Sequence, residues 1–388
     1  MRIAIPIHSF EPGGVERVAL RLAERWQADG QQVMIVLGRD EGLGRREAPR
    51  LDYRTRPEPI PTSRWETIWM IWCLYHFLLE ERVDVVFCPG NTYTVVCTLM
   101  RLLLGDRCPP VLVKISNDLD RPDIAWPFRP FYRLWLSVQG LFLDHFIALT
   151  EPMRPHVVKE LGICKGKTSV IADPALTLAE CDALRMQQAR RCDGSCRFVS
   201  VGRLVAQKNH ALLIEAFARH ASPGDTLVMA GDGPERPALE YIIRKRGLQD
   251  RVFLTGHRHN VRALLRDCNV LVISSDYEGV PAAVVEALAQ GLPIAATNCC
   301  ASMDWLLQHG RFGISTVTGN AEALGLAMNS ARHLAPPREA MAEFAAQFTL
   351  ERAAGTYIDA MQRLLDERSD ESFEKLQRHV RLWLEHGV

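Results

Sequence analysis

Short apolar segments alternate with longer amphipathic segments along most of the chain. A first series of apolar segments is typical of buried strands and comprises Arg2–Ile7, Gln32–Leu37, Val83–Cys88, Val111–Ile115 and Phe146–Leu149. Between them, stretches such as Val15–Asp29 and Trp65–Glu81 have the periodicity of helices. Strands that alternate with helices favour βαβ units and a parallel sheet.

A second series of the same kind follows a break. Its strands are expected at Arg197–Val201, Thr226–Ala230, Val252–Thr255, Val270–Ser274 and Pro293–Ala296. The segment 173–195 has weak periodicity and contains the turn dipeptides Asp173-Pro174 and Asp193-Gly194. We therefore predict two doubly wound α/β domains, 1–172 and 196–347, joined by a linker at 173–195. Ligands of such folds bind at the carboxyl ends of the strands.

Composition excludes some functions. The 46 Lys and Arg residues balance the 46 Asp and Glu residues, so nucleic acid is not an expected partner. The 11 cysteines are scattered, and we expect free, mostly buried thiols. Neither Cys192 and Cys196 nor the pair Cys299-Cys300 has a zinc spacing, so no metal site is predicted.

The sequence also predicts a cytoplasmic location. Met1–Ile7 indicates a strand at once and lacks the apolar core of a signal peptide. The longest apolar run, Ile68–Leu79, is interrupted by His76 and is shorter than the about 20 residues that span a membrane.

The most informative motif follows the expected strand Val270–Ser274. Glu278 and Gly279 lie in its loop, and Pro281 suits the first turn of a helix that contains Glu286. The open amides around Gly279 and Val280 at a helix N-terminus favour an anion such as a diphosphate. Because a carboxylate there would repel phosphate, we expect Glu286 to face a neutral donor of hydrogen bonds, such as a ribose diol. A capping glutamate and a surface glutamate explain the residues equally well.

A second motif follows the expected strand Arg197–Val201. Gly202 ends the strand, and Arg203 and Lys208 lie in the loop before the next helix. Two fixed cations there would bind both phosphates of a leaving group and replace a metal ion. Two solvated surface cations are the alternative.

Two glycine-rich turns lie at other strand ends. Gly13-Gly14 precedes the first helix, and Gly231 and Gly233 follow the strand Thr226–Ala230, where they would let a flat ring approach the backbone. Either turn is also explained as a plain connection. Since no G-x-G-x-x-G motif follows a strand, a nicotinamide dehydrogenase is disfavoured.

Together these segments resemble glycosyltransferase family 4, whose members are retaining enzymes of GT-B fold. The resemblance covers nearly the whole chain and is strongest over 197–300. There the family's motifs occur in order and at its spacing: Gly202-Arg203-x(4)-Lys208, Ala230-Gly231-Asp232-Gly233-Pro234, Thr255-Gly256 and the E-x(7)-E pair Glu278/Glu286. The resemblance implies two Rossmann-like domains that face a central cleft and a C-terminal helix that crosses back to the first domain. Phe348–Leu365 is expected to be that helix within a C-terminal segment 348–388, and an apolar stripe continues through Phe373, Leu376, Val380, Trp383 and Leu384.

The resemblance also implies roles. Arg203 and Lys208 would hold the donor diphosphate, Glu278 would touch the transferred sugar, and Glu286 would bind the ribose. The Gly231–Gly233 loop would lie near the base. Gly13 and Gly14 would close over the phosphate. Retention at the anomeric carbon would follow, by same-face attack without a metal or other cofactor.

Two departures from the family are visible. Many members carry a histidine in a first-domain loop that aligns here with Lys114–Asp118, where Asn117 takes its place. Asn117 would orient a sugar hydroxyl but not accept a proton. The interdomain Asn-Pro of the family is Asp173-Pro174 here, which we interpret as a structural change.

Aromatic residues point to the acceptor. Trp65, Trp69 and Trp72 share one helix face, and Trp126–Trp135 interleaves arginines with aromatics. The helix is expected to pack in the core, whereas the second segment fits equally a packed loop or a surface on the membrane interface.

The expected function is transfer of a sugar from a UDP- or GDP-linked donor to a glycan or lipid-linked acceptor. Polysaccharide or lipopolysaccharide synthesis, with peripheral contact at the cytoplasmic face of the inner membrane, is the expected setting. The alternatives are a nucleotide-sugar epimerase of the same fold and a non-catalytic nucleotide-sugar binding subunit.

Overall fold

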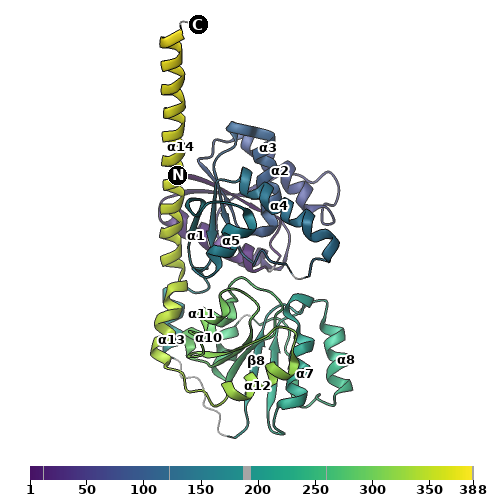
Figure 1. Ribbon diagram of the computed structural model, residues 1–388. Helices are drawn as coiled ribbons and strands as arrows, with labels where there is room; N and C mark the ends of the chain where they lie inside the picture. The colour runs from purple at the N-terminus through teal and green to yellow at the C-terminus, as the bar shows by residue number, and fades with distance from the viewer. Residues whose placement is uncertain (12, 122, 187–193, 259, 387–388) are drawn as a thin grey trace.

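Two parallel sheets, one in each half of the chain, form the protein (Figure 1). The computed structural model describes residues 1–11, 13–121, 123–186, 194–258 and 260–386, with side chains as far as residue 369. The second domain lies below the first in Figure 1, and the last helix runs along the first domain. This confirms the predicted class, two α/β domains with parallel sheets.

The first sheet has seven strands in the order β3-β2-β1-β4-β5-β6-β7, and all neighbours are parallel. They are β1 (Arg2–Ile7), β2 (Gln32–Leu37), β3 (Asp52–Thr55), β4 (Val85–Cys88), β5 (Val111–Lys114), β6 (His145–Ala148) and β7 (Thr168–Val170). Because they are parallel, their carboxyl ends share one edge of the sheet.

Helices cover both faces of the first sheet. They are α1 (Gly14–Ala28), α2 (Glu66–Glu80), α3 (Thr94–Leu104), α4 (Arg129–Phe142) and α5 (Met153–Leu161). Helices α2, α3 and α4 pack side by side over one face. Helix α1 covers the other face together with the C-terminal helix.

The second sheet has six parallel strands in the order β10-β9-β8-β11-β12-β13. They are β8 (Arg197–Val201), β9 (Thr226–Ala230), β10 (Val252–Leu254), β11 (Val270–Ile273), β12 (Ile294–Thr297) and β13 (Gly313–Thr316). The helices around it are α7 (His210–His220), α8 (Arg236–Lys245), α9 (Val261–Arg266), α10 (Ala282–Gln290), α11 (Met303–Leu306), α12 (Ala321–Ala331) and α13 (Arg338–Ala345). Strands β8 and β11 are neighbours, so the loops that follow them lie next to each other.

The predicted linker contains a helix that its weak periodicity did not reveal. Helix α6 (Leu178–Arg185) packs against α10 and α13 of the second domain. Thr177 caps it in a capping box with Glu180, and only Cys181 and Leu184 are buried. Two buried positions in eight residues are too few to produce a clear helical pattern.

The C-terminal helix crosses back to the first domain, as predicted (Figure 1). Helix α14 (Leu350–His386) begins two residues after the expected start and continues well beyond Leu365. Its buried residues, including Tyr357 and Met361, join the core that α1 forms with the first sheet. The indole N–H of Trp26 donates to the carbonyl of Ala354 at 3.0 Å. The predicted stripe at Phe373, Leu376, Val380, Trp383 and Leu384 lies outside the described side chains.

Two further observations concern the described residues. None of their ten cysteines forms a disulfide, and nine of the ten are buried; Cys192 lies outside the described residues. None of the described helices combines the length and the apolar character that crossing a membrane requires.

Candidate functional site

The two charged motifs of the second domain meet at the carboxyl ends of β8 and β11. The ammonium of Lys208 forms an ion pair with the carboxylate of Glu278, and the hydroxyl of Ser275 donates to the same carboxylate at 2.7 Å. The Glu278 side chain is only 8% exposed. The structure thus brings together two residues that the sequence places 70 positions apart.

A set of hydrogen bonds locks these two loops to each other. The Asp276 N–H donates to the Gln207 carbonyl at 2.9 Å, and the Gln207 amide donates back to the Tyr277 carbonyl at 2.8 Å. The side-chain amide of Asn209 donates to Asp276 at 2.9 Å. Asn209 has left-handed backbone geometry and also caps α7. Sequence reasoning missed Gln207, Asn209 and Ser275. Their polar side chains directly after buried strands were the available signal.

Arg203 and Gly202 lie beside this pair. The side chain of Arg203 is exposed and makes no hydrogen bond or ion pair within the described part of the chain. The side chain of Lys208 lies over Gly202, since a Cβ there would be 3.4 Å from Lys208 Cε. Arg203 is therefore the cation with its charge free, whereas Lys208 shares its charge with Glu278.

At Gly279 the backbones of the two domains approach each other closely. A Cβ on Gly279 would lie 2.2 Å from the Ser116 carbonyl oxygen and 3.2 Å from the Asn117 Cα. The Asp118 N–H donates to the Glu278 carbonyl at 3.2 Å across the same contact. We predicted Gly279 as a residue that exposes amides to a diphosphate. The structure gives another reason for glycine here, because the first-domain loop occupies the space of a side chain.

Asn117 is positioned by Asn91. The Asn91 side chain accepts from the Ser116 N–H at 2.8 Å and donates to the Asn117 carbonyl at 3.3 Å. These bonds fix the loop after β5 that meets Glu278 and Gly279. Asn117 thus lies at the interdomain contact.

The loop of Gly231 and Gly233 also packs on protein backbone. A Cβ on Gly231, whose φ is +146°, would lie 1.9 Å from the Gly202 carbonyl oxygen, and one on Gly233 would lie 2.4 Å from that of Leu204. Both glycines therefore let two strand-end loops touch. The structure thus gives a reason for glycine at both positions besides the expected approach of a flat ring.

The Gly13-Gly14 turn begins α1, with Gly13 as its N-cap. A Cβ on Gly13 would overlap the Glu16 carboxylate, whereas Gly14 faces open space. Glu16 accepts from the hydroxyl of Tyr93 at 2.9 Å, which holds the carboxylate beside the turn. Gly14 is the residue of this turn that leaves room for a ligand.

Glu286 lies in α10, while Val280 is buried just before that helix. Burial raises the pKa of Glu286 above its usual value, against the opposing charges of Arg17, Arg262 and Arg21. Its side chain makes no hydrogen bond or ion pair within the described residues. The protein groups that act on the Glu286 carboxylate are charged. The expected neutral donor of hydrogen bonds to Glu286, a ribose diol, would therefore come from a ligand.

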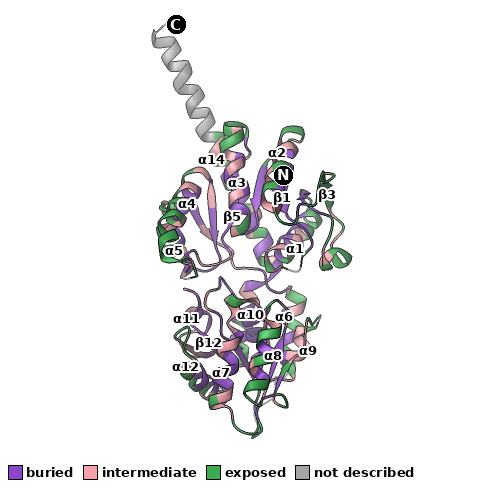
Figure 2. Ribbon diagram, turned by 90° about the vertical axis from the view of Figure 1, so that its right-hand side faces the viewer, coloured by how far each residue is buried: buried purple, intermediate pink, exposed green. Residues whose placement is uncertain are grey.

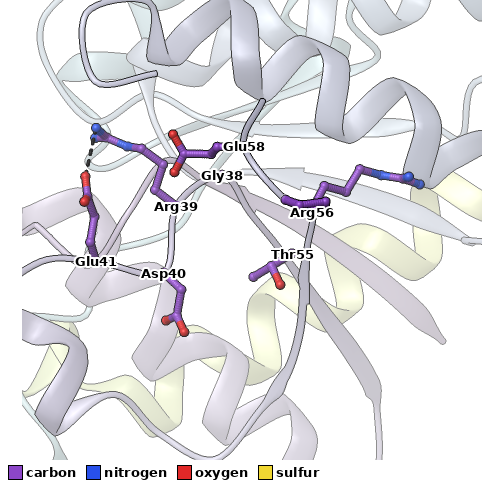
Figure 3. Close-up of a pocket in the computed structure, with 8 residues that line it drawn as sticks. Gly38, Arg39, Asp40, Glu41, Thr55, Arg56 and Glu58 are labelled. Atoms are coloured by element: carbon purple, nitrogen blue, oxygen red, sulfur yellow. Dashed lines mark ion pairs between the residues drawn. The ribbon is translucent and has the colours of Figure 1, made fainter. Parts of the chain in front are cut away.

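The first domain has a polar hollow at the carboxyl ends of β2 and β3 (Figure 3). Its volume is about 510 Å³, and it is lined by Gly38, Arg39, Asp40, Glu41, Thr55, Arg56, Pro57 and Glu58. The buried Arg39 forms ion pairs of 3.0 Å with Glu41 and Glu66. No sequence motif predicts this hollow, because its residues come from two separate loops.

The aromatic segment that runs from the loop after β5 into the first turns of α4 is exposed. Trp126, Phe128, Phe131 and Leu134 are 64–81% exposed. In contrast, Trp69 of α2 is buried and its ring stacks on that of Trp72, which is 42% exposed. The expectation of a core helix is therefore right for Trp69. Of the two interpretations of Trp126–Trp135, the packed loop is wrong.

Among the described residues, no group of three or more His, Cys, Asp or Glu side chains is arranged to hold a metal ion.

Two family models match adjacent parts of the chain. The model described as Glycosyltransferase Family 4 matches residues 12–174, and the one described as Glycosyl transferases group 1 matches residues 186–348. Together they cover both domains. The chain belongs to the family 4 glycosyltransferases.

Relatives agree with this family. The chain is 34% identical over 241 residues to UDP-Gal:alpha-D-GlcNAc-diphosphoundecaprenol alpha-1,3-galactosyltransferase of Escherichia coli, a match of 58% of this chain and 60% of that protein. It is 34% identical over 130 residues to the lipopolysaccharide core biosynthesis glycosyltransferase LpsE of Rhizobium meliloti, a match of 34% of this chain and 37% of that protein. These matches span less than two thirds of either relative.

The fold has close structural neighbours. The structure of Anabaena HepE in complex with UDP-glucose superposes with a TM-score of 0.69 at 19% sequence identity. The match covers 95% of this chain and 100% of that one. The two-domain arrangement of this family 4 chain is therefore the GT-B fold.

Proposed function

We propose that this family 4 protein transfers a sugar from a nucleotide-diphosphate donor to a glycan or lipid-linked acceptor, with retention of anomeric configuration and without a metal ion. The setting we propose is the synthesis of lipopolysaccharide or another cell-surface polysaccharide. The relatives support this, since one is named for a UDP-linked donor and a diphosphoundecaprenol acceptor, and another for lipopolysaccharide core synthesis.

One observation carries the proposal. Glu278, which is paired with Lys208, immediately precedes Gly279 in the chain. The Gly279 backbone in turn contacts the loop of Ser116 and Asn117. A donor bound at the strand ends of the second domain would therefore present its sugar to the first domain at that point. Arg203, whose charge is free, and the N-terminus of α10 would bind the diphosphate.

The proposed mechanism assigns binding and charge stabilisation to the protein. Glu278 already accepts from Lys208 and Ser275, which lowers its value as a nucleophile and favours a role in orienting the sugar. Attack would occur on the face from which the diphosphate leaves, with a donor phosphate oxygen accepting the proton of the acceptor hydroxyl. Positioning and stabilisation of the leaving diphosphate would supply the rate enhancement.

We place the acceptor over the hollow of the first domain. The hollow lies beside the first strand, since the Arg39 N–H donates to the His8 carbonyl at 2.8 Å and Phe10 donates to Glu41 at the same distance. Its carboxylates, guanidinium groups and the Thr55 hydroxyl would suit a polyhydroxylated acceptor. The glycine turn at Gly13-Gly14 follows directly, so the acceptor would reach towards the donor.

We further propose peripheral contact with an anionic membrane through an aromatic face, defined by Trp126, Phe128, Phe131 and Leu134. The segment 124–143 contains two arginines and no acidic residue, so its charge complements anionic lipid. Contact there would leave the protein on the cytoplasmic face of the inner membrane.

Co-sedimentation with phosphatidylglycerol vesicles at low salt tests the aromatic face. We expect the protein to pellet with the vesicles and a Trp126→Ser, Phe131→Ser double variant to stay in solution. Tyr241→Ser, which removes an exposed aromatic side chain of the second domain, is the matched control. Absence of the wild-type protein from the pellet would contradict the membrane proposal alone.

Turnover assays test the transfer reaction itself. UDP- and GDP-sugars are incubated with the protein, with and without GlcNAc-diphosphoundecaprenol, in the presence of a chelator. We expect acceptor-dependent release of the nucleoside diphosphate and a product of retained anomeric configuration by NMR. Conversion of the donor to its epimer without acceptor would indicate the epimerase instead, and binding without any turnover would indicate a non-catalytic subunit.

A further inference from the structure

A network of charges connects the two domains beside Glu286. Glu180 of α6 accepts from Arg21 of α1 at 2.8 Å with one oxygen, and the guanidinium of Arg262 in α9 donates to its other oxygen. Arg21 also donates to the Ala175 carbonyl at 3.3 Å. In Figure 2, α6 and α10 lie at the edge of the second domain below α1. One carboxylate therefore holds an arginine from each domain.

The Glu180 carboxylate is fixed in position and kept ionised by its partners. The Glu180 carboxylate also accepts from the Thr177 N–H at 2.7 Å as part of the cap of α6. Burial opposes the charge of Glu180, but the hydrogen bond from Thr177 and the charges of Arg21 and Arg262 together lower its pKa to about 2. Glu180 is therefore ionised at any pH at which the protein would work.

The same arginines act on Glu286. The charged groups that influence the Glu286 carboxylate are Arg17 and Arg21 of α1, Arg262 of α9 and Glu180 of α6. Although two of these arginines are held by Glu180, Glu286 itself makes no hydrogen bond or ion pair in the described part of the chain. The arrangement keeps a carboxylate unpaired in a predominantly cationic environment.

We propose that Glu180 is a positioning residue, which holds Arg21 and Arg262 so that the Glu286 carboxylate stays free to bind the ribose hydroxyls of the donor. This inference rests on the proposed function, because it takes the ribose to be the ligand of Glu286. Without Glu180, the released Arg262 of α9 would turn to Glu286 of the adjacent α10, on whose carboxylate it already acts. An ion pair of Arg262 with Glu286 would then compete with the ribose.

The effect of Glu180 on the pKa of Glu286 supplies a distinctive readout. The negative charge of Glu180 raises the pKa of Glu286. Glu180→Gln removes that charge and releases an arginine, and both changes lower the pKa of Glu286. The pH below which donor affinity falls, through protonation of Glu286, should therefore shift downward in this variant.

Calorimetric titration with UDP, or GDP if the protein prefers it, over a range of pH tests the inference. At neutral pH we expect Glu180→Gln to weaken binding about tenfold, which corresponds to about 1.4 kcal/mol. The acid limb of its affinity should move to lower pH. In the double variant Glu180→Gln, Arg262→Gln, affinity should recover towards the wild-type value, because the competing arginine is gone.

Glu215→Gln is the matched control. Glu215 of α7 also bridges two arginines, Arg219 at 2.7 Å and Arg246 at 2.6 Å, but all three belong to the second domain. We expect this variant to bind the nucleotide as the wild type does. Loss of an ion-paired carboxylate alone would affect both variants similarly.

The outcomes separate this inference from the proposed function. Wild-type affinity in Glu180→Gln, or a loss that is the same at every pH and is not rescued by the second substitution, would overturn the positioning role. Glu286→Gln tests separately whether Glu286 binds the ribose. If it binds the nucleotide as tightly as the wild type, the ribose assignment of the proposed function fails instead.

Discussion

The cleft edges of the two domains are built differently. In the second domain, the loops after β8 and β11 are cross-linked through Gln207, Asp276 and Asn209, and the Glu278 carboxylate is buried against Lys208. In the first domain, the loops after β2 and β3 surround an open hollow, where Asp40 and Glu41 are largely exposed. The second domain therefore offers a rigid site, which suits the leaving diphosphate. The first domain offers an adaptable site, which suits the acceptor.

Of the substitutions considered, Lys208→Ala should lower the catalytic rate most, because it changes the rigid edge of the second domain. It removes a charge from the rigid edge and leaves the buried Glu278 carboxylate without its cation. We expect kcat to fall by about 10²–10³, the usual cost of one charge-stabilising contact. Steady-state rates with saturating donor measure it. Lys245→Ala, in the exposed last turn of α8, is the control, and equal rates for both variants would remove the distinction between the two edges.

Gly279→Ala tests the contact between the rigid edge and the first domain. Its Cβ would overlap the Ser116 carbonyl oxygen, so the two loops must separate. We expect kcat/KM to fall about tenfold to a hundredfold, a loss of about 1.4–2.8 kcal/mol of transition-state stabilisation, with little change in the melting temperature. Gly355→Ala is the control, because its Cβ would meet no atom within 4 Å. Full activity of Gly279→Ala would show that the contact does not assemble the site.

Thr55→Trp tests the open edge. A large ring in the hollow should exclude the acceptor and raise its KM about tenfold, equivalent to about 1.4 kcal/mol of lost binding, without a change in donor affinity. Slow donor hydrolysis in the absence of acceptor should remain as in the wild type. Ser330→Trp, on the exposed side of α12, is the control. An unchanged acceptor KM would place the acceptor elsewhere.

A change of pH should alter donor affinity at the rigid edge, by less than the substitutions above change the kinetic constants. Burial raises the pKa of Glu286 above its usual value of 4.5, so this carboxylate is protonated at a higher pH than an exposed glutamate. Since the ionised form accepts hydrogen bonds from the ribose, donor affinity should fall a few-fold as the pH falls through that raised pKa. Affinity measured against pH in the wild type and in Glu286→Gln checks this. The same acid limb in both would assign it to another group.

The sequence predicted the inner strands well because they are buried on both faces and form continuous apolar runs. Strands β1, β2, β8 and β9 have the predicted bounds. Strands β3, β7 and β13 were not predicted, and all three lie at sheet edges. Strand β3, for example, has an exposed or half-exposed side chain at every position. These three strands bury too little apolar surface to show a pattern, whereas β10, also at a sheet edge, was predicted.

The site was predictable in its residues but not in its contacts. Glu278 and Lys208 were identified from ordered motifs, and the structure joins them. The reasons given for Gly279 and Gly231 were incomplete, because only the folded chain shows which backbone occupies the space of a side chain. The network of Glu180 could not be inferred, since it joins three helices distant in sequence.

The account depends most on a nucleoside diphosphate that binds at the second domain with its ribose at Glu286. Thermal unfolding of the wild type and of Glu286→Ala with UDP or GDP tests this directly. A ligand at 100 times its Kd should stabilise the wild type by about 2.7 kcal/mol, and the variant should show a much smaller shift at the same concentration. Equal shifts in both proteins, or no shift with either nucleotide, would contradict the account.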